Sequence, residues 1–441
     1  MNKTFARVAL FVCSVAGLYA QTVPYAVVPA WSVAPGEMRP YIWVAPASPA
    51  LVHGPGQSAC NSGNPCYYNP QDLWVAYAIQ PMFNRGDYGQ GITIGIVDAY
   101  YNSQTLSDLV GFSTAYHLPL STGTSTITCP GGNPTVTIVS QTGGAPTAAF
   151  NSGWAQETDL DMQYAHTIAP CANLLLVTGN SADGSDLFSA VQYAYAHADV
   201  VSNSYGGSEA AGEAADDTFF SGSPVPLVFS AGDASDVTEY PCTSPYATCI
   251  GGTNLLTTSN TVRTLESVWY TSSTDGTGGG CSVAGGETQP TYQSSPSPGF
   301  TTALCGTQRG APDIAALADP LSGVNIYFGT NIEGTAGVYC CIGGTSLAAP
   351  LTAGMIALVD QQRVAASKAK LNLSLNTHLY GAASWTPGGT DVQPAPYGNA
   401  YRSIYYDVYS GNEANTYWDR VTGLGVPILP SLSNYLVTQV P

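Results

Sequence analysis

The sequence predicts one large α/β domain with a mainly parallel central sheet and helices on both of its faces. Short apolar runs rich in β-branched residues alternate along the chain with longer stretches of helical character. Strands that are apolar throughout are typical of a parallel sheet that is covered on both sides. The expected strands lie at 92–97, 174–177, 200–201 and 225–229, and the expected helices at 152–168, 185–198 and, as the last one, 345–364. The glycine-, serine- and threonine-rich stretches 121–150 and 271–300 are expected to be long loops.

The first 65 residues differ in character from the rest of the chain. Residues 1–20 place Lys3 and Arg7 before an apolar run, a pattern that is typical of a secretory signal peptide. Residues 21–65 are rich in proline and have neither a helical nor an alternating period. We therefore expect a short leader or linker there, with no full propeptide, followed by the α/β domain at 66–441.

Charge is scarce and strongly unbalanced. Only 9% of the 441 residues are charged, and 11 Lys and Arg stand against 29 Asp and Glu, for a net charge of −18. Nucleic acids and anionic membranes require basic patches, and no stretch after the signal peptide reaches the ~18 apolar residues of a membrane helix. Both are therefore excluded as partners. A surface with few basic groups carries little positive charge in acid, so the folded chain repels itself little. This favours a protein that works in acidic surroundings, and we expect a secreted, extracellular monomer.

Cysteine usage agrees with export. Removing Cys13, which lies in the apolar run, leaves ten cysteines, and an even number in an exported chain predicts disulfides. Cys60–Cys66 and Cys242–Cys249 are the plausible local pairs, and the other partners stay open. A zinc site is the weaker alternative, since there is no C-x-x-C pair and the five histidines are scattered.

A pair of carboxylates on the expected helix at 152–168 is the first candidate for chemistry. Glu157 and Asp161 are four residues apart, so both project from one helix face and can share a proton. Like charges at that distance raise one pKa and couple the two groups. The alternative is an ordinary solvated acidic face, although the basic partners that would stabilise such a face are missing here.

The segment IGGTSLAAP is the second candidate. It places Ser346 at the start of the helix expected at 345–364, where free N–H groups and the helix dipole favour negative charge on a reacting oxygen. A simple serine helix cap is the alternative. We favour a nucleophile because G-T-S-x-x-x-P is much rarer than a cap.

Two further acidic segments are weaker signals when each is taken alone. Asp233, in SAGDASD, follows an expected strand at the sheet edge where parallel sheets place their sites, but it could also be a turn residue beside Gly232. Asp407 and Asp419 flank a loop whose oxygen atoms suit a hard cation such as calcium, without the spacing of an EF-hand.

Together these segments resemble the sedolisins, or serine-carboxyl peptidases, which are acid-acting proteases with a subtilisin-like fold. The resemblance runs from Tyr68 to Pro427. It rests on E-x-x-L-D around Glu157, on GTSLAAP around Ser346, and on SAGD at Asp233. The segments SPYATCIGGT, GGGCS, RGAPDIAALADP and WDRVTGLG match further signatures of the family.

The resemblance implies a serine-type peptidase, a hydrolase of polypeptides. Ser346 would be the nucleophile and Glu157 its general base, with Asp161 orienting Glu157 and sharing its proton. A protonated Asp233 would donate a hydrogen bond to the oxyanion together with the Ser346 N–H. The resemblance also implies one structural Ca²⁺ ion. Its ligands would be the side chains of Asp407 and Asp419 and the backbone carbonyls of Val408, Asn415 and Tyr417.

The chain departs from the family pattern at two places. Sedolisins are usually made behind a large folded propeptide, and 21–65 is too short to be one. Asn415 and Tyr417 also stand where the family tends to have glycines. For the substrate, we expect Gly278, Gly279 and Gly280 to offer backbone groups to an extended peptide.

Two other functions remain as alternatives. A Ser-His-Asp subtilisin is compatible with Asp98, at the end of IGIVDAY, and with the GTS motif, but it needs a histidine in an HGT-like helix start. None of the five histidines has that context: His53, His117, His166, His197 and His378. The other alternative is an inactive relative that acts as a secreted binding protein.

Overall fold

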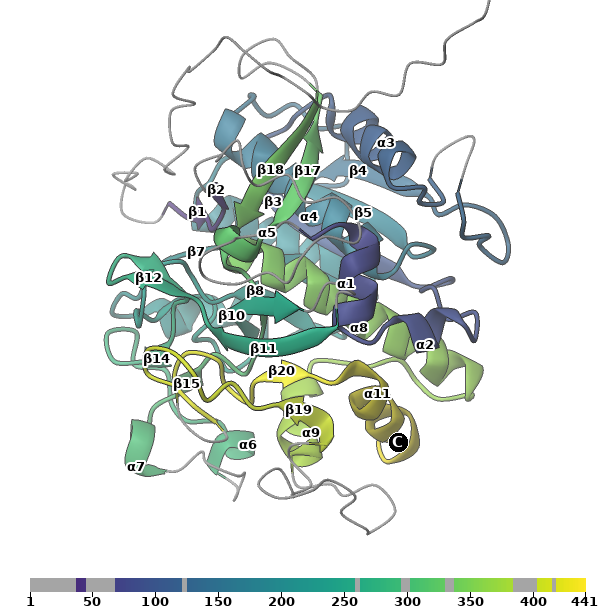
Figure 1. The fold of residues 1–441 in the computed structure, drawn as a ribbon. Coiled ribbons are helices and arrows are strands. Elements are labelled where there is room, and N and C mark those ends of the chain that lie inside the picture. Colours follow the sequence, from purple (N-terminus) through teal and green to yellow (C-terminus); the bar gives the residue numbers. More distant parts are fainter. Residues whose placement is uncertain are drawn as a thin grey trace, which may run out of the picture.

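The central sheet of the domain is mainly parallel, as expected. The computed structural model describes residues 37–44, 68–120, 125–257, 262–294, 302–329, 337–383, 403–414 and 418–441. Within these residues eight strands form the sheet, in the order β11-β10-β8-β6-β3-β5-β4, and β16 also pairs with β10 (Figure 1). Every pairing is parallel except that of β11 with β10. The strands are β3 (Thr93–Ala99), β4 (Val136–Ser140), β5 (Asn173–Gly179), β6 (Val200–Asn203), β8 (Leu227–Ser230), β10 (Thr248–Thr257), β11 (Arg263–Val268) and β16 (Ile314–Leu317).

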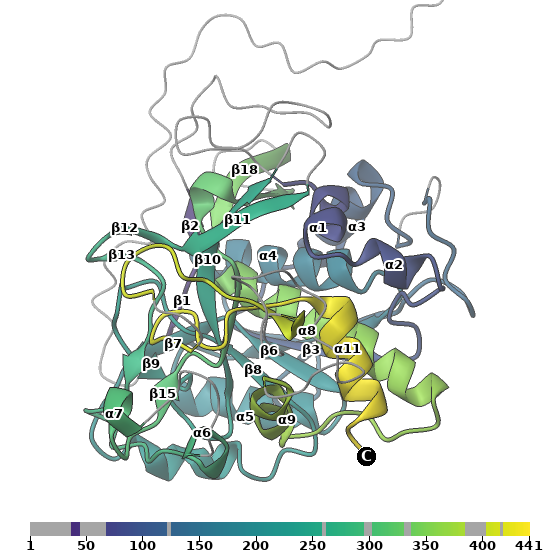
Figure 2. The same cartoon turned by 60° about the horizontal axis from the view of Figure 1, so that its bottom comes forward.

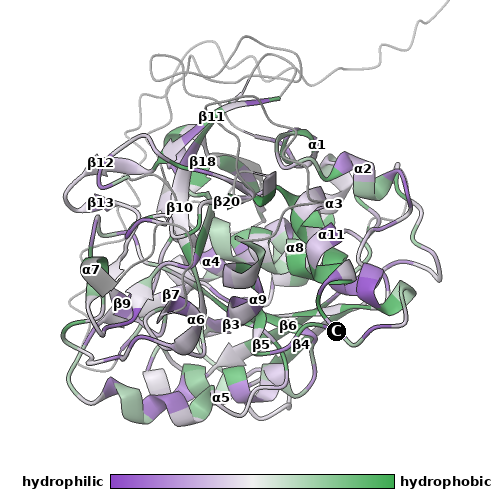
Figure 3. Ribbon diagram, turned by 90° about the horizontal axis from the view of Figure 1, so that it is seen from below, coloured by the Kyte–Doolittle hydropathy of each residue, from purple (hydrophilic) through white to green (hydrophobic). Residues whose placement is uncertain are grey.

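Helices cover both faces of this sheet, so the domain has three layers. α5 (Gly184–Tyr195) packs on one face, and α4 (Ser152–Ile168) and α8 (Thr345–Ala365) pack on the other. Figure 3 places α5 on one side of the strands and α8 on the other. Alternation along β3 explains the two cores, because Ile94 and Ile96 join the α4 and α8 side whereas Val97 joins the α5 side.

α4 and α8 pack extensively against each other. α4 begins at the cap residue Asn151, whose side chain accepts hydrogen bonds from the N–H groups of Gly153 and Trp154, and almost every later residue of the helix is buried. A Cβ atom at Gly354 of α8 would lie only 2.6 Å from Cβ of Ile168. Glycine at this position therefore lets the two helices approach each other.

Smaller elements surround the core. The helices are α1 (Pro70–Ala76), α2 (Gln80–Phe83), α3 (Thr105–Ala115), α6 (Thr291–Ser294), α7 (Thr302–Cys305), α9 (Leu375–Ala382) and α11 (Leu429–Thr438), with short 3-10 turns at Glu213–Phe219 and Pro320–Ser322. The strands are β1 (Arg39–Pro40), β2 (Trp43–Val44), β7 (Tyr205–Ser208), β9 (Glu239–Tyr240), β12 (Tyr270–Ser272), β13 (Asp275–Gly276), β14 (Gly280–Cys281), β15 (Gly310–Ala311), β17 (Val324–Phe328), β18 (Gly337–Gly343), β19 (Tyr405–Tyr406) and β20 (Val426–Pro427).

The expected strands and helices are confirmed, with shifted ends, but three expectations about the connections were wrong. The stretch 121–150 contains β4, and 271–300 contains β13, β14 and α6. Two helices, α9 and α11, follow α8, and α11 packs against both α8 and α9 (Figure 2). β4, VTIVS, is a short β-branched run inside glycine- and threonine-rich sequence, and α11 has leucines at helical spacing, so both carried local signals. Tertiary contacts rather than local periodicity define the much shorter β13, β14 and α6.

Part of the expected leader is built into the fold. β1 pairs with β7, and β2 pairs with β18, both antiparallel, so the segment 37–44 lies on the domain (Figure 1). The signal peptide and the remaining leader residues fall outside the described part of the chain.

Disulfides join segments on both sides of the sheet. Cys242–Cys249 is confirmed, and the structure adds Cys129–Cys171 and Cys281–Cys305. The expected Cys60–Cys66 pair and the side chains of Cys340 and Cys341 lie outside the described residues. Among the helices that the structure describes, none has the length and apolar character required to cross a bilayer.

Several carboxyl groups away from the sheet edge are buried. Burial raises the pKa of Asp360, on α8, to about 7, although its Oδ1 accepts a hydrogen bond of 2.7 Å from the Leu371 N–H. Burial also raises the pKa of Glu213 to about 7 and, with help from neighbouring carboxylates, that of Glu287 to about 8. Such groups hold protons in the folded protein at pH values where the unfolded chain has lost them.

Stability should therefore fall as the pH rises from about 4 toward 8. Between the ordinary and the raised pKa the folded state binds more protons than the unfolded state, so acid favours folding. One pKa unit is about 1.4 kcal/mol, which moves the Tm of a large domain by about 2–4 °C. We expect the Tm in calorimetry to be at least that much higher at pH 5 than at pH 8.

Asp360→Asn should raise the Tm at pH 8 and leave it nearly unchanged at pH 5, because the amide keeps the acceptor for Leu371 without a buried charge. Asp183→Asn, at an exposed position, is the matched control and should leave the profile as it is. A Tm that is higher at pH 8 than at pH 5 would contradict this account.

Candidate active site

Ser346 lies at the N-terminus of α8, and it is fully buried. Gly344, just before the helix, has φ +102, a conformation that favours glycine. Pro350 has no N–H, so the Ser346 carbonyl lacks the usual helical donor four residues on. Instead Ser204 Oγ lies 3.3 Å from that carbonyl oxygen, while Ser346 Oγ donates to the carbonyl of Ser204 at 3.2 Å.

Two carboxyl groups of α4 face this serine. Glu157 and Asp161 are both fully buried on the side of α4 that packs on α8. Ser204 Oγ donates a hydrogen bond of 2.8 Å to Asp161 Oδ1. Neither oxygen of Glu157 has a well-formed hydrogen bond to a described residue, and the Ser346 hydroxyl is the polar group beside it that lowers its pKa.

Burial and mutual repulsion together raise the pKa values of these carboxyls. Burial raises the pKa of Glu157 well above its ordinary value, and the negative charges of Asp161 and Asp98 raise it further. Burial and Asp98 act in the same direction on the pKa of Asp161. Asp98, at the end of β3, is itself fully buried, and burial raises its pKa to about 7. Burial and mutual repulsion therefore favour protonated forms in this group of three carboxyls.

A further carboxyl, that of Asp233, reaches the start of α8 from the sheet. Asp233 follows β8, and its Oδ1 accepts hydrogen bonds of 2.8 Å from both the N–H and the hydroxyl of Thr345. Its Oδ2 is buried with no hydrogen-bond partner among the described residues. A Cβ atom at Gly344 would lie 2.7 Å from Asp233 Oδ2, so this oxygen is directed to the start of α8. Burial raises the pKa of Asp233 to about 8, which leaves it protonated at neutral pH.

The structure thus brings together the four side chains that the sequence singled out, namely those of Glu157, Asp161, Asp233 and Ser346. Sequence reasoning missed Ser204, which touches both Asp161 and Ser346. It considered Asp98 only for the rival histidine mechanism. The signal was available, because IGIVDAY places a carboxylate at the end of a buried strand.

The glycines expected to hold substrate lie beside the site but use their backbone within the fold. Gly278 N–H donates to the Gly232 carbonyl at 2.7 Å, and Gly279 N–H donates to the Val237 carbonyl at 3.0 Å. Gly280 pairs with Ala311 in the strand pair β14–β15. These contacts engage the N–H groups of Gly278 and Gly279 within the fold, and the substrate-binding role of the three glycines stays a prediction.

The expected calcium ligands are described only in part. Asp407 and Val408 follow β19 and are buried, as is Asp419. Asp419 Oδ1 accepts hydrogen bonds from the N–H groups of Val421 and Thr422 at 2.9 and 2.7 Å. Asn415 and Tyr417 lie outside the described residues, and the described part of the chain holds no cluster of three or more metal-binding side chains.

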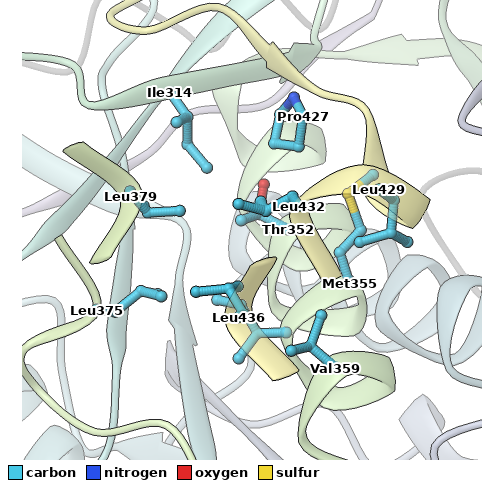
Figure 4. A pocket seen from close by; sticks show the side chains of 11 residues that line it. Ile314, Thr352, Met355, Val359, Leu375, Leu379, Pro427, Leu429, Leu432 and Leu436 are labelled. Carbon is cyan, nitrogen blue, oxygen red and sulfur yellow. The ribbon is translucent and has the colours of Figure 1, made fainter. Parts of the chain in front are cut away.

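An apolar pocket lies elsewhere, between α8, α9 and α11 (Figure 4). Its walls include Met355, Leu379 and Leu432, and its one polar lining side chain is that of Thr352. With no titratable group in its walls, this pocket is part of the packing of the C-terminal helices.

Comparison with known proteins agrees with this geometry. The sequence model of the subtilase family (Peptidase S8) matches residues 89–399. Kumamolisin from Bacillus sp. (strain MN-32) is 29% identical over 410 residues, which cover 86% of this chain and 65% of kumamolisin. Sedolisin from Pseudomonas sp. (strain 101) is 32% identical over 213 residues, which cover 45% of this chain and 30% of sedolisin. The chain thus spans less than two thirds of the length of either relative.

Among solved structures, Pseudomonas sedolisin complexed with pseudo-iodotyrostatin superposes with a TM-score of 0.63 at 26% identity, covering 85% of this chain and 99% of that one. On its family match, its relatives and its fold, the chain belongs to the subtilase family and, within it, to the sedolisins.

Proposed function

We propose that this chain is an exported, acid-acting serine-type peptidase that cleaves polypeptides through an acyl-enzyme on Ser346. The observation that carries the proposal is the convergence of three buried carboxyls, Glu157, Asp161 and Asp233, on a serine at a helix N-terminus. The N-terminal signal pattern and three disulfides support export.

In the proposed acylation step Glu157 takes the proton of Ser346 Oγ as that oxygen attacks the substrate carbonyl. Asp161 shares the proton with Glu157, so negative charge spreads over the pair. Glu157 then returns the proton to the leaving amine, and in deacylation it takes a proton from water. Ser204 orients Asp161 through their 2.8 Å hydrogen bond.

The oxyanion would be held by two donors. The Ser346 N–H has no helical acceptor, because it belongs to the first turn of α8. Protonated Asp233 supplies the second donor from Oδ2, since Thr345 already occupies its Oδ1. Preorganised donors of this kind stabilise the charge that develops in the transition state.

Activity in acid follows from the charges around the base. The charged groups that act on the pKa of Glu157 are all carboxyls, those of Asp161, Asp98 and Asp233. Each ionisation beyond the first adds another buried negative charge, and ionisation of Asp233 removes an oxyanion donor. The competent state therefore belongs to acidic solution.

A histidine mechanism has little support in the geometry. Ser346 Oγ contacts the Tyr41 N–H and the Ser204 carbonyl. His197 follows α5, which packs on the other face of the sheet from α8. His166 is a buried residue near the end of α4, and burial lowers its pKa to about 3. An inactive binding protein would have no need of four converging catalytic groups.

The rate of cleavage of denatured casein should have an optimum at roughly pH 3–5. Ser346→Ala should abolish it, and Glu157→Gln should lower kcat by about 10²–10⁴-fold, the range for loss of a general base. Circular dichroism of both variants provides the folding control. An optimum above pH 7 would contradict the carboxylate base, and full activity of Ser346→Ala would contradict the nucleophile.

Asp233 should set the alkaline limit of activity. Below its pKa of about 8 it is protonated and donates; above that value the donor is lost. Asp233→Ala should lower kcat by about 10²–10³-fold, whereas Asp233→Asn, whose amide donates at every pH, should retain activity and lose the alkaline decline. Equal loss in the folded Asn and Ala variants would refute this role.

We also propose that the loop between β19 and β20 holds one structural calcium ion. Buried carboxylates at Asp407 and Asp419 suit a hard cation, with backbone carbonyls such as that of Val408 completing the site. The ion would stabilise the loop, and no catalytic step involves it.

Calcium at about 100 times its Kd should stabilise the fold by about 2.7 kcal/mol, which a thermal scan with and without chelator would detect. Asp407→Asn should remove this response, and Asp183→Asn, at an exposed position outside the loop, should keep it. A Tm that calcium leaves unchanged would contradict the site.

A further inference from the structure

Side chains of α3 and α4 hold the outer edge of strand β17, against which both helices pack (Figure 1). Along its other edge β17 pairs with β18, and β18 leads into the helix start that carries Ser346. We infer that Asp108 and Asp159 share one proton and form a clamp that holds the outer edge of β17 in acid and opens as the pH rises. This clamp is separate from the proposed chemistry at Ser346.

Two of the contacts along this edge come from neutral side chains of α4. The Tyr164 hydroxyl donates to the Asn325 carbonyl at 2.6 Å. Gln163 makes two hydrogen bonds with the backbone of Tyr327, donating to its carbonyl at 2.7 Å and accepting from its N–H at 2.8 Å. Alternate residues of a strand direct their N–H and C=O groups to the same edge. Gly329, two residues after Tyr327, therefore presents its N–H on this edge as well.

The third contact is made by a carboxyl. The Gly329 N–H donates to Asp108 of α3. A Cβ atom at Gly329 would lie 2.0 Å from Asp108 Oδ1, so glycine permits this close approach. Asp108 also forms a hydrogen bond with Asp159 of α4, and both residues are only 1% exposed. The strand edge is thus joined to both helices through a buried pair of carboxyls.

The hydrogen bond between these two carboxyls requires a proton. Carboxylate oxygens only accept, so one of the two groups must carry an O–H. Asp108 accepts from the Gly329 N–H and the Asn102 side chain, and these donors stabilise its ionised form. Neither oxygen of Asp159 has another hydrogen-bond partner among the described residues. The proton therefore stays on Asp159, which donates to ionised Asp108.

The charges around the pair favour the same arrangement. Burial raises the pKa of Asp159 well above its ordinary value, and the negative charges of Asp108 and Asp98 raise it further. The described segments α3, α4, β3 and β17 contain no lysine or arginine. His166 of α4 is neutral, because burial lowers its pKa to about 3. The remaining titratable side chains of these elements are those of Glu157, Asp161, Tyr164 and Tyr327.

The closed clamp is favoured in acid and weakened as the pH rises. In the open clamp water reaches Asp159, so its pKa returns toward the ordinary value of about 4. Between that value and the raised one, the closed clamp binds one proton more than the open clamp. Each pH unit in this range therefore favours opening by up to about tenfold. The strand that supports β18 is held most firmly in acid.

Hydrogen exchange of the full chain, followed by mass spectrometry on a peptide that contains residues 324–329, tests the clamp from pH 5 to pH 8. After correction for the intrinsic exchange rate, the protection of this peptide in the wild type should fall by up to about tenfold per pH unit. Asp159→Asn should show no such fall, because its amide donates to Asp108 at every pH. Asp360→Asn replaces another buried carboxyl, beside Leu371 on α8, and as the matched control should behave as wild type.

Wild-type protection that is equal at pH 5 and pH 8 would overturn the clamp, as would an undiminished fall in folded Asp159→Asn. Asp108→Asn is the second variant, in case Asp159→Asn does not fold. Its amide can donate to Asp159 and still accept from Gly329, so its protection should fall less than that of the wild type, and an equal fall would overturn the clamp. The readout does not depend on catalysis. A chain that cleaves no casein but shows the expected exchange would overturn the proposed function and leave the clamp standing.

Discussion

The structure depends on a group of carboxyls that are packed out of water where α4 meets the N-terminus of α8. Glu157, Asp161 and Asp98 are fully buried, and Asp233 nearly so. Burying an ionised carboxylate without a cation is very costly, so such groups hold protons instead. Folding therefore favours the protonated forms of these carboxyls. The proposed mechanism uses the same protons for catalysis.

The residues around these carboxyls bring them close to Ser346. Gly354 lets α4 and α8 approach closely, which brings both carboxyls of α4 to the serine. Pro350 frees the Ser346 carbonyl from the helix, and Ser204 lies between that carbonyl and Asp161. When Asp161 is protonated it can donate to Ser204 Oγ, which can then donate to the Ser346 carbonyl. A change in the protonation of Asp161 thus alters the hydrogen bonds at the helix end that carries the proposed nucleophile.

The segment 37–44 lies against Ser346 and helps to bury the same group of carboxyls. By covering Ser346 it keeps water from the carboxyls, and it places its own carbonyl against the proposed oxyanion donors. Pairing with β7 and β18 and the Arg39–Glu239 ion pair hold this short strand in place.

Much of this could be predicted from the sequence, because it follows local rules. α4 and α8 were expected as helices from their own segments, and the E-x-x-x-D pair of α4 and the serine at the start of α8 are the local signals behind the proposed site. What could not be predicted depends on contacts between distant segments. β4 lies in a stretch rich in glycine and threonine, the role of Ser204 needs the fold of β6 and β7, and the docking of 37–44 joins residues about 300 positions apart. The position of Asp98 at a strand end could be predicted, but its role could not, since an aspartate at this place is also compatible with a histidine mechanism.

The central claim is that the Asp233 carboxyl is protonated in the folded protein at neutral pH. Difference infrared spectroscopy of wild type against Asp233→Asn, from pH 5 to 9, measures this directly through the C=O stretch of a protonated carboxyl. The account predicts a protonated-carboxyl band in the wild type that is absent from the variant and disappears near pH 8. A wild type that lacks this band already at pH 6, with a carboxylate band in its place, would contradict the account.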